Sequence, residues 1–197
     1  LFHNAKKLLE NGTGPYFYLP KLEHYLECRL LDEVISFCEK KLGLDNGTVK
    51  VTVLIETINA VFQMEEFLYE LKNHIVGLNA GRWDYLFSYQ KVYRNTKKVI
   101  LPDRSKVNMF VPFMSNYNKL LVDTCHKRGA FGMGGMSAQV IAKSNPKEVN
   151  ENALAGVKKD KERELEQGND GAWVAHPSLV EPVKNIFEKN FDGPNQM

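Results

Sequence analysis

Short apolar runs alternate with longer amphipathic stretches along this chain, and this alternation restricts its fold more than any other feature. Strands are predicted at residues 15–20, 49–55, 74–79, 129–133 and 172–175, and helices at about 21–42, 59–73, 112–127, 146–166 and 178–189. Only a crossover connection returns a chain to pair with a strand in the same direction, so these strands should form a parallel sheet. The expected fold class is α/β.

Two architectures contain such sheets, the doubly wound sheet and the (β/α)8 barrel. No glycine-rich turn follows the first strand, and carboxylates follow neighbouring strands, which fits the mouth of a barrel better. We therefore expect a TIM barrel of which this chain covers about five strand–helix units, whereas a closed barrel needs eight. The chain starts at Leu1 in a helix-like segment without a cap. Residues 1–197 are thus expected to form a single, incomplete barrel domain that lacks the N-terminal part of the barrel.

Composition argues against several classes of protein. Lys and Arg number 26 against 24 Asp and Glu, for a formal net charge of +2 without a basic block, which argues against a nucleic-acid partner. The chain has no run of about 18 apolar residues, the length needed to span a membrane, and its first residues do not form a secretory signal. Cys28, Cys38 and Cys125 form no C-x-x-C pair, so we interpret them as reduced thiols in helices. The expectation is a soluble, intracellular protein.

A carboxylate follows each of two consecutive predicted strands. Glu56 comes directly after residues 51–55, and Asp84 lies just beyond residues 75–79. Because the carboxyl ends of barrel strands meet at one mouth, the two acids could share a Mg²⁺ ion, which prefers carboxylate and water oxygens. The alternative is that each acid caps the following helix or pairs with a neighbour such as Arg82.

Three other features carry weaker signals. The stretch 80–84, with its glycine, could bind a small carboxylate through free N–H groups, or it could be an ordinary loop. The glycine-rich residues 132–136 match no phosphate-binding motif and are interpreted as close backbone packing at the barrel mouth. His176 could be a general base or a metal ligand, but a lone histidine is more often a packing or hydrogen-bonding residue. The charged stretch 158–164 alternates in sign, as expected of a solvated helix face.

Several long motifs occur in order along the chain: GPYFYLPK at 14–21, LIET at 54–57, IVGLNAGRWDYLFSY at 75–89, CHKRGAF at 125–131, MGGM at 133–136 and DGAWVAHP at 170–177. Together they resemble the malate synthase family, in the shorter A-type form of the glyoxylate cycle. The resemblance runs from Leu1 to about Phe191. It implies a (β/α)8 barrel and a transferase that condenses acetyl-CoA with glyoxylate and water to give malate and CoA.

The resemblance also implies roles for particular residues. Glu56 and Asp84 would be the ligands of a Mg²⁺ cofactor. Glyoxylate would bind at Glu56 and along Gly81, Arg82, Trp83 and Asp84. Pro177 would lie against the thioester end of acetyl-CoA.

Two catalytic residues of the family lie outside this chain. The family's arginine belongs to an Arg-Gly-Leu-His type motif and its aspartate base to a Met-Glu-Asp type motif in a C-terminal helical domain, and neither motif occurs here. We therefore expect the C-terminal helical domain to be absent and this stretch alone to be inactive. Two alternatives stay open: a related Mg²⁺-dependent acyl-CoA lyase barrel, and a non-catalytic fragment that retains only the metal half-site. Expected locations are the peroxisome or glyoxysome in a eukaryote and the cytoplasm otherwise, and a homo-oligomer is possible.

Overall fold

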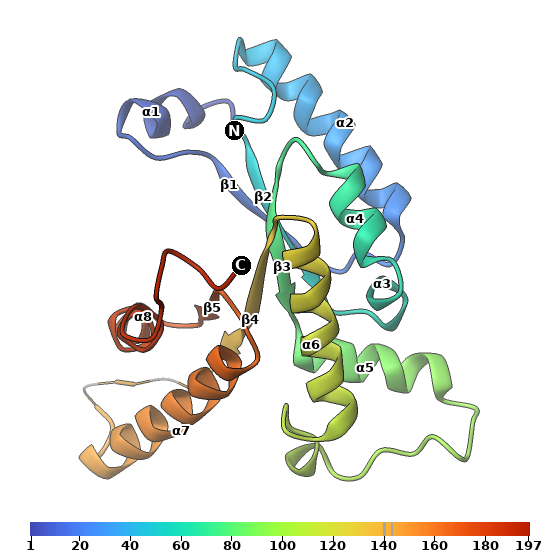
Figure 1. The fold of residues 1–197 in the computed structure, drawn as a ribbon, viewed down its shortest axis with the longest axis vertical. Coiled ribbons are helices and arrows are strands. Elements are labelled where there is room, and N and C mark those ends of the chain that lie inside the picture. The colour runs from blue at the N-terminus through green and yellow to red at the C-terminus, as the bar shows by residue number, and fades with distance from the viewer. Residues whose placement is uncertain (140, 143) are drawn as a thin grey trace.

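A computed structural model describes residues 1–139, 141–142 and 144–197. Five parallel strands form one sheet in sequence order: β1 (Tyr16–Leu19), β2 (Lys50–Ile55), β3 (Ile75–Ala80), β4 (Phe131–Ser137) and β5 (Gly171–Val174). A doubly wound sheet would reverse its strand order at a switch point, and this one does not. The sheet is therefore half of a TIM barrel, as predicted (Figure 1).

Helices connect the strands. They are α1 (Ala5–Glu10), α2 (Tyr25–Leu42), α3 (Ile58–Val61), α4 (Met64–Glu70), α5 (Arg82–Tyr93), α6 (Pro112–Lys127), α7 (Lys147–Glu166) and α8 (Val180–Glu188), with short 3-10 helices η1 (Arg104–Lys106) and η2 (Pro177–Leu179). Figure 1 shows α2, α4 and α6 on one side of the sheet, and α7 and α8 near the edge of the sheet formed by β4 and β5. No helix among the described residues has the length and apolar character that a membrane crossing requires.

The main core lies between the sheet and the helices that cover its outer side. Val51, Val53 and Ile55 of β2 are almost fully buried, and Phe67 of α4 and Leu121 of α6 are fully buried in the same cluster. A strand covered on both faces reads as a nearly continuous apolar run, which explains why β2 was recognisable in the sequence. The central strands are thus firmly anchored, and their carboxyl ends have fixed positions.

Three helical segments differ from the sequence prediction. The helix expected at 59–73 is two helices: α3 ends at Val61 with Phe62 as its C-cap, and α4 begins at Met64. The apolar spacing of the predicted helix places Val61, Phe62, Phe67, Leu68 and Leu71 on its buried side. Phe62 is instead 76% exposed because the break points it outward, and the other four are buried. The stretch after β3 is not a loop but the start of α5, and Asp84 lies in its first turn.

The glycine-rich stretch belongs to β4, which runs to Ser137 rather than ending at Met133. A Cβ on Gly77 of β3 would lie 2.2 Å from the carbonyl oxygen of Phe131 on β4, so the two strands approach closely only because Gly77 has no side chain. Within the predicted stretch 132–136, a Cβ on Gly132 would lie 3.1 Å from the Val122 Cα of α6, which is close backbone packing as predicted, whereas the close neighbour of Gly134 is the Glu164 side chain.

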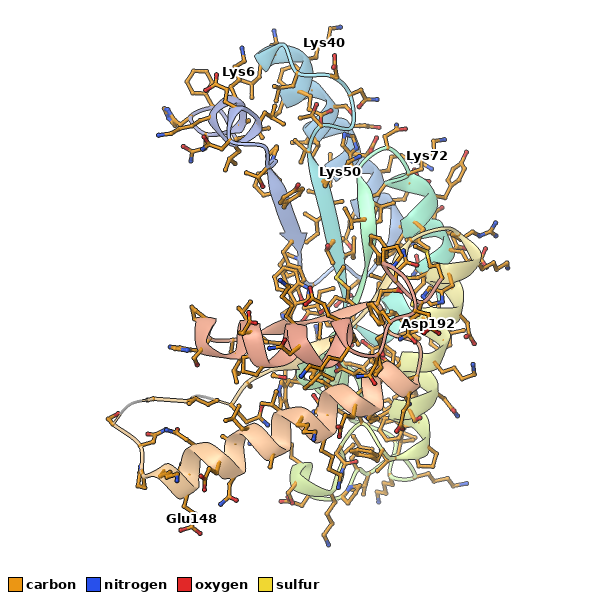
Figure 2. The ribbon with its side chains drawn as sticks, turned by 60° about the vertical axis from the view of Figure 1, so that its left-hand side comes forward. Lys6, Lys40, Lys50, Lys72, Glu148 and Asp192 are labelled. Atoms are coloured by element: carbon orange, nitrogen blue, oxygen red, sulfur yellow. The ribbon has the colours of Figure 1, made fainter. Side chains whose placement is uncertain are left out.

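The two ends of the sheet differ in character. Figure 2 shows the labelled Lys40, Lys50 and Lys72 near the end where the strands begin, and Lys50 is the first residue of β2. The carboxylates singled out from the sequence lie at the other end, where the strands finish. Barrels of this kind carry their chemistry at that end.

Candidate metal and substrate site

The carboxylates of Glu56 and Asp84 both form ion pairs with the Lys21 side chain. Glu56 follows the last residue of β2, Asp84 lies in the first turn of α5 beyond β3, and both carboxylates contact Lys21. The Lys21 Nζ lies 3.0 Å from Glu56 Oε2 and 3.0 Å from Asp84 Oδ2. The structure thus brings together the two acids that the sequence singled out. It does not support the alternative that Glu56 caps the next helix, since the Thr57 side chain caps α3.

Lys21 also holds Glu56 through its backbone. Its N–H donates to Glu56 Oε1 over 2.7 Å. Lys21 has a φ of 61°, the single positive φ at a non-glycine position among the described residues. A side chain in this region is unfavourable by about 1 kcal/mol or more, so the surroundings must hold it there. No residue pattern indicates this role, because Lys21 directly follows Pro20 and stands at the start of a predicted helix.

Burial and charge act differently on the two acids. Glu56 is fully buried, and burial raises its pKa although the hydrogen bonds from Lys21 lower it. The side chain of Asp84 is 45% exposed. Its partial burial would raise the pKa of Asp84, but the Lys21 ammonium outweighs that effect and brings the pKa below its usual range. A cation between the two oxygens therefore stabilises their charged forms.

A buried tyrosine ties the two strand ends together. The Tyr117 hydroxyl of α6 donates to the Ile55 carbonyl, one residue before Glu56, and accepts from the Gly81 N–H over 2.9 Å. Its ring stacks on Tyr85 with centroids 4.4 Å apart. A Cβ on Gly81 would lie 2.6 Å from the Glu56 Cβ, so the start of α5 can approach Glu56 only with glycine there. Tyr117 and Gly81 thus position the two acids.

A pocket of about 480 Å³ opens beside this pair. Five of the predicted site residues line it: Glu56, Gly81, Arg82, Trp83 and Asp84. Pro177 does not line it, although η2 follows the carboxyl end of β5 on the same side of the sheet.

The inner side of the sheet adds polar residues to the pocket. The Tyr18 hydroxyl on β1 donates to Asn79 Oδ1 over 3.1 Å, and Asn79 Nδ2 donates to the Gly134 carbonyl over 2.6 Å. The Tyr18 ring packs against Trp173 of β5 with centroids 4.4 Å apart. Burial raises the pKa of Tyr18, so its hydroxyl stays protonated. This chain of contacts links β1, β3 and β4 across the barrel mouth.

Basic groups lie at the pocket rim. The Arg82 guanidinium stacks over the Trp83 ring at 3.8 Å, and Arg104 approaches the same ring at 5.0 Å. Burial lowers the pKa of Arg82, although the Asp160 carboxylate opposes this. The first N–H groups of α5 have no acceptor within the helix, as at any helix start. This end of the pocket is suited to a small anion.

The residues present fit a magnesium ion. Glu56 Oε2 is buried, and no hydrogen bond of regular geometry reaches it from the described residues, so its partner is the positive charge of the Lys21 ammonium 3.0 Å away. Mg²⁺ is commonly held by one or two carboxylates and takes its other oxygens from water and substrate. Within the described part of the chain no group of three or more His, Cys, Asp or Glu could hold a metal by itself. A two-carboxylate site beside an open pocket is compatible with that pattern.

The charged stretch 158–164 is a solvated face only in part: Lys158, Lys159 and Glu162 are exposed as predicted, but three other residues of the stretch are buried. Lys161 is fully buried, and Arg163 and Glu164 are 5% and 1% exposed. Asp160 and Glu164 line the same pocket as Glu56. The alternation of signs is typical of a surface helix, but here opposite charges pair with one another beneath β4 and can be buried for that reason.

Other candidates behave as the sequence suggested. The His176 ring caps η2 by accepting from the Ser178 N–H over 3.2 Å, a hydrogen-bonding role. Cys28, Cys38 and Cys125 are free thiols, and burial raises the pKa of Cys28 and of Cys125 to about 12. Neither thiol is activated as a nucleophile.

Comparison with known proteins gives consistent results. A family model described as "Malate synthase, TIM barrel domain" matches residues 1–197. Malate synthase of Myxococcus xanthus is 48% identical over 196 residues, covering 100% of this chain and 36% of that protein. Glyoxysomal malate synthase of Candida tropicalis is 51% identical (100% and 35%), and malate synthase A of Escherichia coli is 50% identical (94% and 34%). The chain thus spans about a third of the length of these relatives.

Solved structures show the same fold. A citrate lyase from Burkholderia xenovorans superposes with a TM-score of 0.68 at 19% identity, covering 89% of this chain and 49% of that one. Malate synthase of Haloferax volcanii, solved as a lead(II) complex, has a TM-score of 0.67 at 16% identity, covering 97% and 49%. At such low identity these structures support the barrel architecture alone.

Proposed function

The chain belongs to the malate synthase family, whose TIM-barrel domain it matches along its whole length, and from this premise we propose that it carries the metal-binding and glyoxylate-binding part of a malate synthase active site. The proposed reaction condenses acetyl-CoA with glyoxylate and water to give malate and CoA, with Mg²⁺ as cofactor. One observation supports it most: the carboxylates of Glu56 and Asp84, which follow two neighbouring strands, both contact the Lys21 ammonium beside a pocket.

The residues of the pocket have distinct parts in this proposal. Glu56 and Asp84 hold the magnesium ion, whose chemistry is that of a Lewis acid polarising an aldehyde oxygen. The backbone from Gly81 to Asp84 binds the glyoxylate carboxylate through the N–H groups of Arg82, Trp83 and Asp84, because a helix start presents unpaired donors and the positive end of the helix dipole. The Gly81 N–H already donates to the Tyr117 hydroxyl. Arg82 adds a positive charge at the rim. Contact of Pro177 with acetyl-CoA stays a prediction.

The remaining chemistry requires two more groups. A base must remove a proton from the acetyl methyl group, and a cation must stabilise the enolate that forms. The chain contains neither the Arg-Gly-Leu-His nor the Met-Glu-Asp type motif. Removing a positioned base typically costs about 10²- to 10⁴-fold in rate, and removing an electrostatic donor about 10²- to 10³-fold. We therefore expect negligible malate formation by the 197 residues alone.

Metal binding tests the proposal directly. We expect the chain to bind Mn²⁺, used as a spectroscopic substitute for Mg²⁺, and to bind it more tightly when glyoxylate is present. Glu56→Gln and Asp84→Asn should each weaken binding by about tenfold or more, because each removes a charged ligand oxygen. Electron paramagnetic resonance of free Mn²⁺ measures the affinity.

Asp123→Asn is the matched control, because Asp123 is an exposed acid on α6 that pairs with Lys119. It should bind Mn²⁺ as the unchanged chain does. Equal Mn²⁺ affinity in the Glu56, Asp84 and Asp123 variants, with folding confirmed by circular dichroism, would refute the metal site. Product analysis with acetyl-CoA and glyoxylate, on a protein that also carries the arginine and aspartate motifs, would separate malate synthesis from an acyl-CoA lyase reaction.

The names of the relatives suggest a cellular location, which we add to the proposal. Relatives from Candida tropicalis, Brassica napus and Cucumis sativus are named glyoxysomal, and others come from bacteria. We propose a peroxisomal or glyoxysomal location in a eukaryotic host and a cytoplasmic one otherwise.

A further inference from the structure

A charged pair on α7 is buried behind the glycine-rich strand. Lys161 is fully buried and Glu164 is 1% exposed. The Lys161 Nζ lies 2.9 Å from Glu164 Oε2 and 3.3 Å from the Asp160 carboxylate, while Arg163 lies 3.3 Å from Glu164 Oε1. Removing such charges from water is costly, and an apolar pair of similar size is often at least as stabilising. Stability alone therefore does not explain why α7 buries them.

Both side chains hold the same glycine. The Lys161 Nζ donates to the Gly135 carbonyl over 2.6 Å, and the Gly135 N–H donates to Glu164 Oε1 over 2.9 Å. Lys161 and Glu164 are three positions apart on a helix and so project from the same face. One face of α7 thus satisfies both polar groups of Gly135.

Gly135 lies where the regular pairing of β4 and β5 is interrupted. Gly134 pairs with Ala172, but the next pair is Ser137 with Val174, with a register shift between them. An interruption of this kind leaves backbone groups without ladder partners, and such groups must be satisfied in another way when they are buried. Lys161 and Glu164 supply those partners.

The arrangement depends on the neighbouring glycine and shapes the pocket. A Cβ on Gly134 would lie 2.0 Å from Glu164 Oε2, so only glycine lets the carboxylate reach the strand. Gly135, Met136 and Ser137 then line the same pocket as Glu56 and Asp84. Displacement of Gly135 would therefore change the pocket.

We propose that Lys161 and Glu164 are positioning residues, which together fix the irregular segment 134–137 of β4 and hence one wall of the substrate pocket. The link to substrate rests on the proposed function. The link to the backbone of β4 does not.

Hydrogen exchange tests the backbone part. The variant Lys161→Met with Glu164→Leu removes both charges and keeps apolar volume, so it should fold and melt close to the unchanged chain. Amide exchange in a peptide covering residues 131–139 should nevertheless become at least about tenfold faster, because Gly135 loses both partners. The matched control is Lys158→Met with Glu162→Leu, an exposed pair on the same helix, which should leave this exchange unchanged.

Two single variants separate hydrogen bonding from charge. Glu164→Gln keeps an acceptor oxygen for the Gly135 N–H and should exchange nearly as slowly as the unchanged chain, whereas Glu164→Leu should exchange faster. Unchanged exchange in a folded double variant would overturn the proposal. So would equal exchange in the Gln and Leu variants, which also decides the matter if the double variant does not fold.

Ligand affinity tests the pocket part. The double variant should bind glyoxylate with Mn²⁺ about tenfold more weakly, because a loosened wall misplaces the contacts. Faster exchange with unchanged affinity would overturn the role in the pocket. If the unchanged chain binds neither Mn²⁺ nor glyoxylate, the proposed function fails, and the exchange comparison still decides the backbone role.

Discussion

The buried Glu164 carboxyl should make the stability of the folded chain depend on pH. Burial raises its pKa to about 7, although the Lys161 ammonium opposes the rise. In the unfolded chain the group ionises near its ordinary pKa of about 4.3. Between these values the folded protein binds the extra proton, so the free energy of unfolding should fall as pH rises from about 4.5 to 7. Burial of this carboxyl lowers the free energy of unfolding by about 4 kcal/mol at pH values above that window, where the effect is constant.

Glu164→Gln removes the titrating group and keeps the shape. Urea unfolding of the two proteins between pH 5 and pH 8 measures the effect. As pH rises to about 7, the free energy of unfolding of the unchanged chain should fall relative to that of the variant. Glu188→Gln, at an exposed acid of α8, should keep the original slope. Parallel pH profiles for the unchanged chain and the Glu164 variant would contradict the prediction.

At the same scale, the sequence predicted only part of the site. Glu56 and Asp84 could be found because acids after parallel strands converge at one end of a sheet. Lys21 could not, since its role depends on a positive φ that no residue pattern reports. Lys161 and Glu164 resembled a solvated surface, because their partners lie on β4, far away in the sequence.

At the scale of elements, strands were more predictable than helices. The apolar run of β2 identified its place, because both faces of that strand are covered. On α2, by contrast, Leu26, Leu30, Val34 and Phe37 repeat at helical spacing yet are 47–60% exposed, while Cys28, Ile35 and Glu39 face inward. Periodicity located the helix but did not identify its buried face. The break at Phe62 was equally invisible, since no proline or glycine marks it.

Close packing of β3 against β4 predicts a strong effect of one methyl group. Gly77→Ala would place a Cβ 2.2 Å from the Phe131 carbonyl oxygen, which cannot move without breaking the strand pairing. We expect a loss of about 2–3 kcal/mol in the free energy of unfolding, measured by urea denaturation. The backbone of Gly77 has an ordinary φ, so the loss would come from the collision alone.

Gly156 offers the matched control on α7. A Cβ there would meet only Gln139 Nε2 at 3.7 Å, an ordinary contact. Gly156→Ala should therefore stabilise the chain by about 0.5–1 kcal/mol, because alanine favours the helix and restricts the unfolded chain. A Gly77→Ala variant as stable as the Gly156→Ala variant would show that β3 and β4 are not held as closely as described.

At the scale of the whole molecule, the sheet has two open edges. β1 pairs only with β2 and β5 only with β4 among the described strands, whereas a closed barrel leaves no edge. An edge strand presents unpaired N–H and C=O groups to any neighbour. Phe17 on β1 is 42% exposed at such an edge. The half-barrel therefore has a surface on which another chain can add a strand.

Self-association through this edge is the expected behaviour of the 197 residues. Sedimentation velocity should show larger species as concentration rises, and Phe17→Lys should shift the association midpoint about tenfold higher, because a charge on an edge strand disfavours pairing with another edge. Phe62→Lys makes the same change at a residue that is 76% exposed between α3 and α4, away from the sheet edges, and should leave association unchanged. A chain that stays monomeric at all concentrations, or an equal response to both lysines, would mean that β1 is not the associating edge.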